Sequence, residues 1–213
     1  MRIISGWAKG RKLIPPPAQG NLIRPTSDRA RESLFNIIAG RTQGASVLDL
    51  FAGTGALGLE ALSRGAESVC FVDCHPQALT LINRNVQICQ DAFNHRPEIQ
   101  HDNGSGQFKN SRPVTLIKHD LRRGLPMFSK YLPSCSGFDL IFIDPPYSQG
   151  LSSLLLRALD TSSWLRQQTL LIVEERSSET LPQDLITLSL MDQRKYGDTG
   201  FWFYQPLPTS PTS

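Results

Sequence analysis

Apolar and polar positions follow two different periods along most of this chain. Short apolar runs typical of strands occur at residues 46–50, 68–73, 114–120, 138–144, 169–175 and 201–206. Between them, apolar residues spaced three and four apart predict helices at 55–66, 76–90 and 151–159. Strands that alternate with helices indicate an α/β fold, in which helices cover both faces of a doubly wound, mostly parallel sheet.

The first forty residues depart from this alternation. β-Branched residues, two glycine bends and a proline stop predict a short hairpin or ribbon in residues 2–17. A helical period follows, and it predicts a helix with one apolar face, formed by Ala30, Leu34, Ile37 and Ile38. Arg29 and Arg31 lie off this face, so we expect both to project outward.

Two further stretches show neither period. Residues 91–113 are polar and rich in glycine and asparagine, which predicts a surface insertion. The composition of residues 207–213 predicts a disordered tail.

The composition excludes several classes of protein. A chain of 213 residues, 39% hydrophobic and 19% charged, is long enough for a substantial core and is not of the disordered class. No apolar run approaches the ~18 residues of a membrane-spanning helix, and the N-terminus lacks the apolar core of a signal peptide. The four cysteines show no C-x-x-C spacing, so we expect free thiols in a reducing cytoplasm and no metal centre.

Positive charge is concentrated at the N-terminus. The formal net charge is +3, but residues 1–31 contain seven Lys and Arg residues against one acid, Asp28. A basic arm on a mildly acidic body suggests contact with a polyanion, because contacts to phosphates supply most of the sequence-independent affinity for nucleic acid. Charge alone does not distinguish such an arm from an N-terminal surface that is exposed to solvent and binds no polyanion.

A glycine motif follows the apolar run at 46–50. Gly53, Gly55 and Gly58 form G-x-G-x-x-G, and Asp73 lies twenty residues after Gly53. This pattern is typical of a loop that binds an adenosine-bearing cofactor, with the acid on the ribose hydroxyls. The glycines do not distinguish a nicotinamide dinucleotide from another adenosine cofactor.

Four acids end, or nearly end, successive predicted strands: Asp49, Asp73, Asp120 and Asp144. Ligands of open α/β sheets bind outside the carboxyl ends of the strands, where the strand order reverses. We therefore expect one cleft to contain the glycine loop and several of these carboxylates.

The motif Asp144-Pro145-Pro146-Tyr147 indicates the chemistry. Because prolines fix the backbone, a carboxylate, the Pro145 carbonyl and an aromatic ring are held in a stiff array. Two such acceptors can hydrogen-bond the N–H groups of a planar amine while the ring stacks on its heterocycle. A nicotinamide enzyme has no need of this array, so the motif favours group transfer to an aromatic amine.

Together these motifs resemble the amino-methyltransferases that use S-adenosylmethionine. The segments MRIISGWAKGRKL, RPTSDRARESLFNII and LDLFAGTGALGLEALSRGA are similar to the bacterial 16S ribosomal RNA guanine-N2 methyltransferases of the RsmD type. The resemblance covers residues 1 to about 90 and about 114 to 204. It implies a seven-stranded Rossmann-like sheet, S-adenosylmethionine as cofactor, S-adenosylhomocysteine as product, and one guanine of 16S rRNA as substrate.

The resemblance also implies an organisation and a partner. We expect a basic, RNA-contacting hairpin and helix in residues 1–40, a methyltransferase domain with the polar insertion in 41–206, and a tail in 207–213. The partner is expected to be 16S rRNA, free or within a small ribosomal subunit, and the protein a cytoplasmic monomer that does not bind membranes.

Residue roles follow from the matching positions. The residues expected to be catalytic are Asp144, Pro145, Pro146 and Tyr147. Those expected to bind the cofactor are Asp49, Phe51, Ala52, Gly53, Thr54, Gly55, Asp73, Asp120 and Leu121. Those expected to contact rRNA are Lys9, Arg11, Lys12, Arg24, Arg29 and Arg31. Whether Asp144 accepts a proton or only orients the amine is left open.

The chain also differs from the family pattern, and other functions remain open. Asp73 stands where the family more often has glutamate, and the insertion at 91–113 is longer than usual. Within methyltransferases, an adenine-N6 or a protein-glutamine enzyme can carry the same Asp-Pro-Pro-Tyr motif. Outside them, the alternatives are a nicotinamide-dependent oxidoreductase and an RNA-binding module without catalysis.

Overall fold

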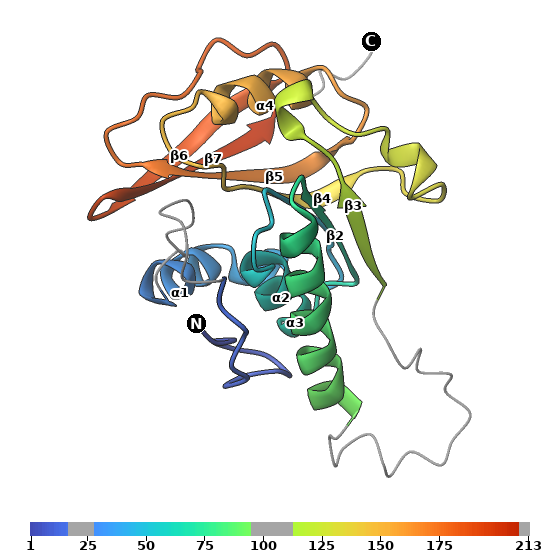
Figure 1. Cartoon of the computed structure of the whole chain (residues 1–213). Coiled ribbons are helices and arrows are strands. Elements are labelled where there is room, and N and C mark those ends of the chain that lie inside the picture. The colour runs from blue at the N-terminus through green and yellow to red at the C-terminus, as the bar shows by residue number, and fades with distance from the viewer. Residues whose placement is uncertain (17–27, 95–112, 209–213) are drawn as a thin grey trace.

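One seven-stranded sheet is formed by the part of the chain that the computed structural model describes, residues 1–16, 28–94 and 113–208 (Figure 1). The strand order is β3-β2-β1-β4-β5-β7-β6. The strands are β1 (Ser46–Leu50), β2 (Ser68–Asp73), β3 (Val114–Lys118), β4 (Phe138–Ile143), β5 (Leu165–Arg176), β6 (Leu188–Tyr196) and β7 (Thr199–Pro206). Strands β1 to β5 are parallel, whereas β7 is antiparallel to both β5 and β6. The predicted mostly parallel α/β sheet is confirmed.

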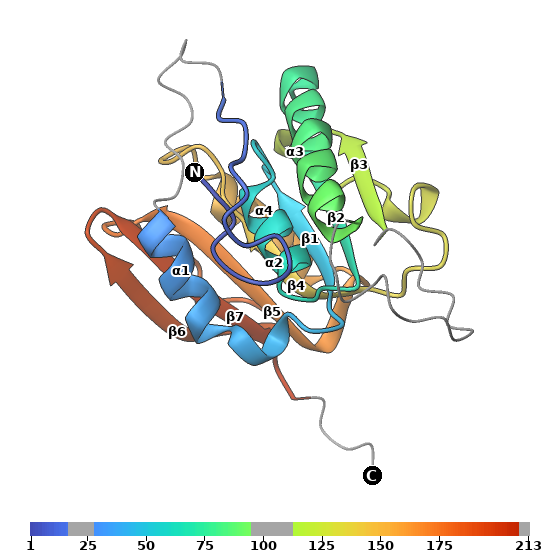
Figure 2. The ribbon, with the colours of Figure 1, turned by 90° about the horizontal axis from the view of Figure 1, so that it is seen from below.

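Helices cover both faces of this sheet. α1 (Asp28–Ile37), α2 (Ala56–Ser63) and α3 (Pro76–Asn94) lie on one face, and α4 (Leu151–Asp160) lies on the other (Figure 1, Figure 2). Successive residues of a strand face opposite layers: Val47 of β1 packs with the α1–α3 layer and Leu48 with the α4 layer. A sheet covered on both faces requires nearly continuous apolar strands, which explains the apolar runs of the sequence. Short 3-10 turns occur at Ala39–Arg41, Leu121–Arg123 and Phe128–Lys130.

The parallel strands end at a common edge of the sheet. Leu50, the last residue of β1, pairs with Val72 of β2 and with Ile143 of β4. The strand order reverses between β1 and β4, because β2 and β3 lie on one side of this junction and β5 on the other. Such a reversal point is where open α/β sheets bind their ligands.

The strands and α3 differ in part from the sequence-based expectation. The pattern does not predict β6, because most of its side chains are polar and at least partly exposed. Strand β5 begins four residues earlier than expected, at Leu165 rather than at residue 169. Helix α3 continues through Asn94, so the expected insertion at 91–113 begins with helix rather than loop. Residues 95–112 of that insertion, and 209–213 of the expected tail, lie outside the described residues.

Helix α1 buries most of the predicted apolar face, because Ala30, Leu34 and Ile38 all belong to the core. Ile37 is 44% exposed, whereas Phe35 is fully buried and packs against Phe142 of β4 with ring centroids 5.8 Å apart. Arg31, expected to project outward, is also fully buried. The buried face is therefore wider than predicted: it includes Phe35 and Arg31, and the outward orientation predicted for Arg31 is wrong.

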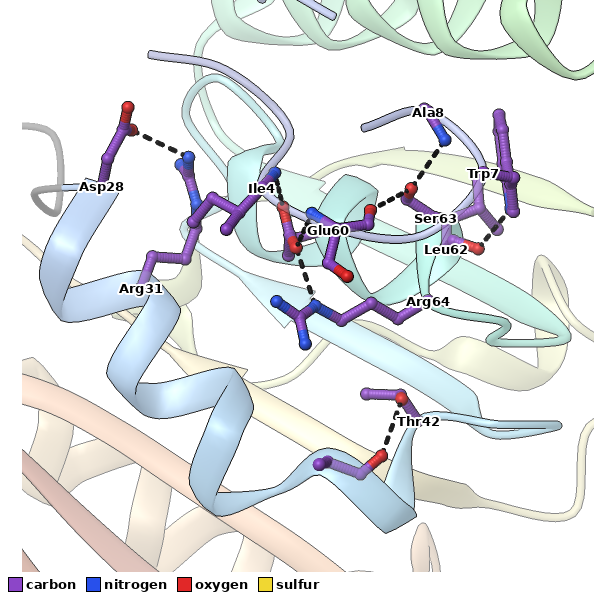
Figure 3. Close-up of polar contacts among 12 residues, drawn as sticks. Ile4, Trp7, Ala8, Asp28, Arg31, Thr42, Glu60, Leu62, Ser63 and Arg64 are labelled. Carbon is purple, nitrogen blue, oxygen red and sulfur yellow. Dashed lines mark hydrogen bonds and ion pairs between the residues drawn. The ribbon is translucent and has the colours of Figure 1, made fainter. Parts of the chain in front are cut away.

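The N-terminal segment forms a hairpin-like turn that packs on α2. One antiparallel bridge, between Arg2 and Lys12, replaces the regular strands that were expected. The carboxylate of Glu60 on α2 accepts hydrogen bonds from the backbone N–H groups of Ile4 at 2.7 Å and Ser5 at 3.0 Å (Figure 3). Glu60 is itself fully buried. A buried carboxylate therefore binds the N-terminal segment to the helix that follows the glycine loop.

Ser63 forms the second attachment. Its hydroxyl accepts from the backbone N–H of Ala8 at 2.9 Å, and the indole N–H of Trp7 donates to the carbonyl of Leu62 at 2.8 Å (Figure 3). Gly6 has a φ of +80°, and a Cβ atom there would lie 1.8 Å from the carbonyl oxygen of Ser63. The close approach of this segment to α2 therefore requires glycine at position 6.

The antiparallel end of the sheet depends on a single carboxylate. Asp160, the last residue of α4, accepts from the backbone N–H groups of Ile186 at 2.6 Å, Thr187 at 2.7 Å and Leu188 at 2.9 Å. Burial raises the pKa of Asp160, but these donors outweigh it and hold the pKa below its ordinary value. The bonds fix the chain where β6 begins.

We expect Asp160→Ala to lower the free energy of unfolding by about 2–4 kcal/mol, because three backbone donors lose a buried acceptor. Since the pKa is lowered in the folded state, the difference from the wild type holds at neutral pH and shrinks below about pH 4. Urea denaturation at several pH values measures both effects. Asp184→Ala, which removes an exposed pair with Arg157, is the control and should cost less than about 1 kcal/mol. Equal losses for the two variants would contradict this role of Asp160.

Candidate active site

A pocket of about 990 Å³ lies at the carboxyl edge of the parallel strands. It extends from the end of β3, at Asp120, across the ends of β2, β1 and β4 to the end of β5, at Arg176. Its volume is at the upper end of the range for small-molecule and cofactor sites. The pocket therefore lies where the strand order predicts a ligand.

Nearly all residues that the sequence singled out for cofactor binding and catalysis line this pocket. They are Asp49, Phe51, Ala52, Gly53, Thr54, Asp73, Asp120, Leu121, Asp144, Pro145, Pro146 and Tyr147. Gly55 does not line the pocket; it is the residue that precedes α2, with a φ of +77°. One cavity thus brings together two motifs separated by about ninety residues in the sequence.

The loop between β1 and α2 is tightly folded. Phe51 and Gly53 have left-handed backbone angles, with φ of +60° and +55°. The conformation of Phe51 is unusual for a residue with a bulky side chain, and such strain is often found at functional sites. Gly58 has a different task, because a Cβ atom there would lie 2.4 Å from the ring of Phe71. Gly58 lets α2 pack closely on β2.

Asp73 both supports the glycine loop and lines the pocket. One carboxylate oxygen accepts from the backbone N–H of Gly53 at 2.9 Å, and the other accepts from the N–H of His75 at 2.8 Å. Each oxygen can accept a further hydrogen bond, since an ionised carboxylate offers about four acceptor positions. Asp73 is therefore suited to contact a hydroxyl group while it holds the loop.

Asp49 is a buried acid beneath the same loop. Its carboxylate accepts from the backbone N–H of Gly58 at 2.9 Å, and its side chain is 2% exposed. Burial raises the pKa of Asp49 to about 8; the hydrogen bond from Gly58 opposes this, and the charge of Asp73 adds to it. A cationic ligand group beside Asp49 would favour the ionised form.

Asp120 differs from the other acids because it already has a cationic partner. Its carboxylate accepts from Arg122 Nε at 2.8 Å and Nη2 at 2.9 Å, and from the backbone N–H of the same residue. Hydrogen bonding to Arg122 lowers the pKa of Asp120 to about 2. Asp120 therefore stays ionised at any physiological pH.

Asp144 faces the pocket with its acceptors available. Among the residues that the structure describes, none donates a hydrogen bond to its carboxylate. Burial, and then the charges of Glu174, Asp49 and Glu175, raise the pKa of Asp144 well above its ordinary value. A half-buried acid that accepts no hydrogen bond from the described residues, at the reversal point of the sheet, is the strongest sign of function in this part of the chain.

Two glutamates at the end of β5 hold the Asp144–Tyr147 turn in place, and the sequence analysis missed both. Glu174 accepts from the Tyr147 hydroxyl at 3.3 Å, while Glu175 accepts from the backbone N–H of Ser148 at 3.2 Å and from the Ser152 hydroxyl at 3.1 Å. Because neighbouring residues of a strand point to opposite faces, the two glutamates bind different parts of this turn. The sequence does contain a signal, because two consecutive acids directly follow the apolar run at residues 170–173 of this strand.

Tyr147 is fixed as a hydrogen-bond donor. Its hydroxyl also lies 3.4 Å from the Thr199 hydroxyl, and the guanidinium of Arg176 lies 6.0 Å from the centre of its ring. Burial, followed by the charge of Glu174, raises the pKa of Tyr147, so the phenol stays protonated. The ring position is thus set from outside the Asp-Pro-Pro-Tyr motif.

The residues expected to contact rRNA fall into two groups. Lys9, Arg11, Lys12 and Arg29 are exposed, whereas Arg31 is buried and lines the pocket. Arg24 lies outside the described residues. Only the exposed group is available to a large partner without a change of conformation.

Neither a membrane span nor a cluster of metal ligands is found in the described part of the chain. None of its helices has the length and hydropathy needed to cross a membrane. Groups of three or more His, Cys, Asp or Glu side chains that could hold a metal ion are likewise absent from those residues. The four cysteines are free thiols.

Comparisons with known proteins find similar sequences and structures. A profile of the family described as Conserved hypothetical protein 95 matches residues 1–120 and 107–205. The Escherichia coli K12 protein named Ribosomal RNA small subunit methyltransferase D is 32% identical over 205 residues, covering 96% of this chain and 89% of that protein. The solved structure of a hypothetical protein from Thermus thermophilus is similar with a TM-score of 0.69 and 27% identity, covering 95% of this chain and 98% of that one.

A more distant structure has the same fold. The rRNA methyltransferase aviRa from Streptomyces viridochromogenes superimposes with a TM-score of 0.63 at 18% identity, covering 93% of this chain and 91% of that one. At this identity the likeness concerns the fold.

We expect Asp144→Asn to stabilise the folded protein at neutral pH. The raised pKa of Asp144 means that the wild type loses stability as the pH rises from the ordinary pKa of about 4 through the raised value, whereas the variant has no such loss. The gain should be small at pH 4 and reach about 1 kcal/mol or more at pH 8. Urea denaturation across this range measures it, and a gain that is independent of pH would contradict the raised pKa.

Proposed function

We propose a function for this chain from the family to which it belongs, the one described as Conserved hypothetical protein 95, which includes RsmD-type rRNA methyltransferases. The proposed reaction is methylation of the exocyclic N2 amine of one guanine in 16S rRNA, with S-adenosylmethionine as methyl donor. One observation carries the proposal. The available carboxylate of Asp144 and the Phe51–Gly55 loop line a single pocket at the reversal point of the sheet. That pocket has room for a cofactor and for an extruded base together.

The pocket residues fit S-adenosylmethionine. This molecule has an adenosine part, two ribose hydroxyls and an amino acid part with an ammonium and a carboxylate. Acids line the pocket at the ends of three adjacent strands, Asp120, Asp73 and Asp49, in the order that suits adenine, ribose and ammonium. The pocket wall also contains buried guanidinium N–H groups of Arg31 that have no partner in the described part of the chain.

The chain's contribution to the reaction is mainly alignment. S-adenosylmethionine, when bound, supplies a methyl group that its sulfonium charge has already activated. The Asp144 carboxylate and the Pro145 carbonyl accept hydrogen bonds from the guanine amino group and draw its N–H bonds out of the ring plane, which localises the nitrogen lone pair. Alignment of reacting groups can lower a barrier by about 7–11 kcal/mol.

Asp144 also accepts the proton that the amine releases. Its raised pKa makes it a stronger base than an ordinary carboxylate once it is ionised, and a cationic ligand nearby favours that ionised form. Tyr147 stacks on the base, which must first leave its own stack at a cost of a few kcal/mol. Glu174 and Glu175 keep this arrangement rigid.

The exposed basic residues of the N-terminal region would bind rRNA phosphates. Lys9, Arg11, Lys12 and Arg29 project from residues 1–40, which we propose as the RNA-contacting extension, while 41–206 form the methyltransferase domain. Ile3 and Leu13 of the extension belong to the same core as the domain, so it is expected to present these charges on a fixed surface. The proposed partner is 16S rRNA or a small ribosomal subunit that contains it.

Transfer of tritium from labelled S-adenosylmethionine to undermodified small-subunit rRNA tests the proposal. We expect label in N2-methylguanosine at one mapped position, and a loss of at least about 100-fold for Asp144→Ala. Asp139→Asn is the matched control on the same strand: its carboxylate pairs with Arg166 at 2.7 Å at the opposite end, and the rate should stay within about twofold.

Other results of this experiment would contradict the proposed substrate, the proposed reaction or the role of Asp144. Label in N6-methyladenosine or in protein glutamine would replace the proposed substrate, and the absence of any transferred label would exclude a methyltransferase. Full activity of Asp144→Ala would remove Asp144 from catalysis.

Cofactor affinity should depend on pH through Asp49. The pKa of this acid is raised to about 8 without ligand, so binding of an ammonium beside it releases a proton. The affinity for S-adenosylhomocysteine should therefore increase from pH 6 to pH 7.5 by up to about tenfold per unit, with proton release measurable by calorimetry in buffers of different ionisation enthalpy. Asp49→Asn should bind more weakly and lose this slope; an unchanged slope in the variant would contradict the assignment.

A further inference from the structure

Arg31 is a buried cation whose hydrogen bonding is incomplete. It lies in the first turn of α1, and its side chain has no exposed surface. One nitrogen, Nη2, donates to the backbone carbonyl of Arg2. It also donates to the Asp28 carboxylate at 2.9 Å (Figure 3). The other two nitrogens, Nε and Nη1, have no hydrogen-bond partner among the described residues.

Such a pair of orphaned donors needs an explanation. Buried polar groups in native proteins are nearly always hydrogen-bonded, and the requirement is strongest for charged groups. Glu60 and Glu174 are near enough to favour the charged form of Arg31, but neither accepts a hydrogen bond from it in the structure. The neighbouring charges therefore explain why the guanidinium is tolerated and not why two of its nitrogens lack acceptors.

The position of Arg31 limits what the missing acceptor can be. Arg31 lines the large pocket, and its contact with the carbonyl of Arg2 places it beside the chain's first two residues. The Thr54 hydroxyl of the glycine loop donates to the sulfur of Met1, the residue before Arg2, at 3.7 Å. Arg31 is thus connected to the loop end of the pocket, whereas Asp73 and Asp120 lie at the ends of the neighbouring strands β2 and β3.

The other arginines that line the pocket in the described residues are exposed. Arg122 is paired with Asp120, and Arg176 lies at the end of β5 near the ring of Tyr147. Arg31 is therefore the buried arginine of the pocket wall, and a buried guanidinium with free N–H groups is most readily satisfied by an anionic oxygen ligand.

We propose that Arg31 binds the carboxylate of the amino acid part of the cofactor through Nε and Nη1. This inference rests on the proposed function, because S-adenosylmethionine has one carboxylate, attached to the same carbon as the ammonium assigned to Asp49. A buried cation and a buried acid would then bind the two charges of one amino acid group. Arg31 was expected to bind rRNA phosphates; this assignment replaces that role with one inside the pocket.

Calorimetry with two ligands separates the carboxylate from the rest of the cofactor. The probes are S-adenosylhomocysteine and its decarboxylated analogue, 5′-(3-aminopropyl)thioadenosine, which keeps the adenosine, sulfur and ammonium. The wild type should bind S-adenosylhomocysteine about 10- to 100-fold more tightly than the analogue. Arg31→Met should lose that preference and bind the analogue within about twofold of the wild type, and Arg31→Lys should retain part of the preference.

Arg64→Met is the matched control. Arg64 donates to Glu60 at 2.7 Å and is mostly buried in the same charge cluster, but it does not line the pocket. It should retain the full preference for the carboxylate. Thermal unfolding followed by circular dichroism checks that each variant is folded, and the wild-type comparison of the two ligands requires no variant at all.

The outcomes are distinct. Equal wild-type affinity for the two ligands, or equal loss of both in a folded Arg31→Met, would overturn the inference while leaving the proposed function intact. Failure of the wild type to bind either ligand would overturn the proposed function, and the role of Arg31 with it.

Discussion

The register of β1 between β2 and β4 is the constraint on which the site depends. Parallel hydrogen bonding aligns Leu50 with Val72 and with Ile143, so the three chains leave the sheet at the same level. Each strand end then places its acid or its loop into one pocket. A slip of one residue in any of these strands would turn its apolar side chains to the wrong face and its acid away from the pocket.

The N-terminal segment completes the pocket by binding to α2. Glu60 and Ser63 fix residues 4–8 through backbone N–H groups, and Gly6 permits the close approach (Figure 3). These contacts place Met1 beside Thr54 of the glycine loop and Arg2 beside Arg31. A segment that charge alone marks as an RNA-binding arm is thus also part of the pocket wall.

This arrangement places several acidic side chains near one another in the site. Asp49, Asp144, Glu174 and Glu175 lie close together, and burial is the main cause that raises the pKa of the first two. The charge of Asp73 adds to the shift of Asp49, and the charges of Glu174, Asp49 and Glu175 add to the shift of Asp144. Asp49 accepts a hydrogen bond from Gly58 of α2, Glu174 accepts one from Tyr147 and Glu175 one from Ser148, whereas Asp144 accepts none from the described residues. The site thus keeps one acid unsatisfied, and such local instability is common where a substrate group completes the hydrogen bonding.

The sequence by itself determined the sheet, its helices and the two motifs that meet in the pocket. Mainly apolar runs such as SVLDL and FDLIFI are local signals, because a strand buried on both faces needs apolar residues at nearly every position. The same signal is absent from β6, whose partly exposed residues follow no simple pattern, so only pairing with β7 decides that it is a strand.

The tertiary structure decided which polar groups have partners. Arg31 looks like a surface residue in the sequence, but the buried face of α1 is wide enough to include both Arg31 and Phe35, which packs on Phe142. The roles of Glu174 and Glu175 depend on a turn 27 residues earlier in the chain. A hydrogen-bond partner far away in sequence leaves no periodic trace, because periodicity records which side of an element is buried and not what it is buried against.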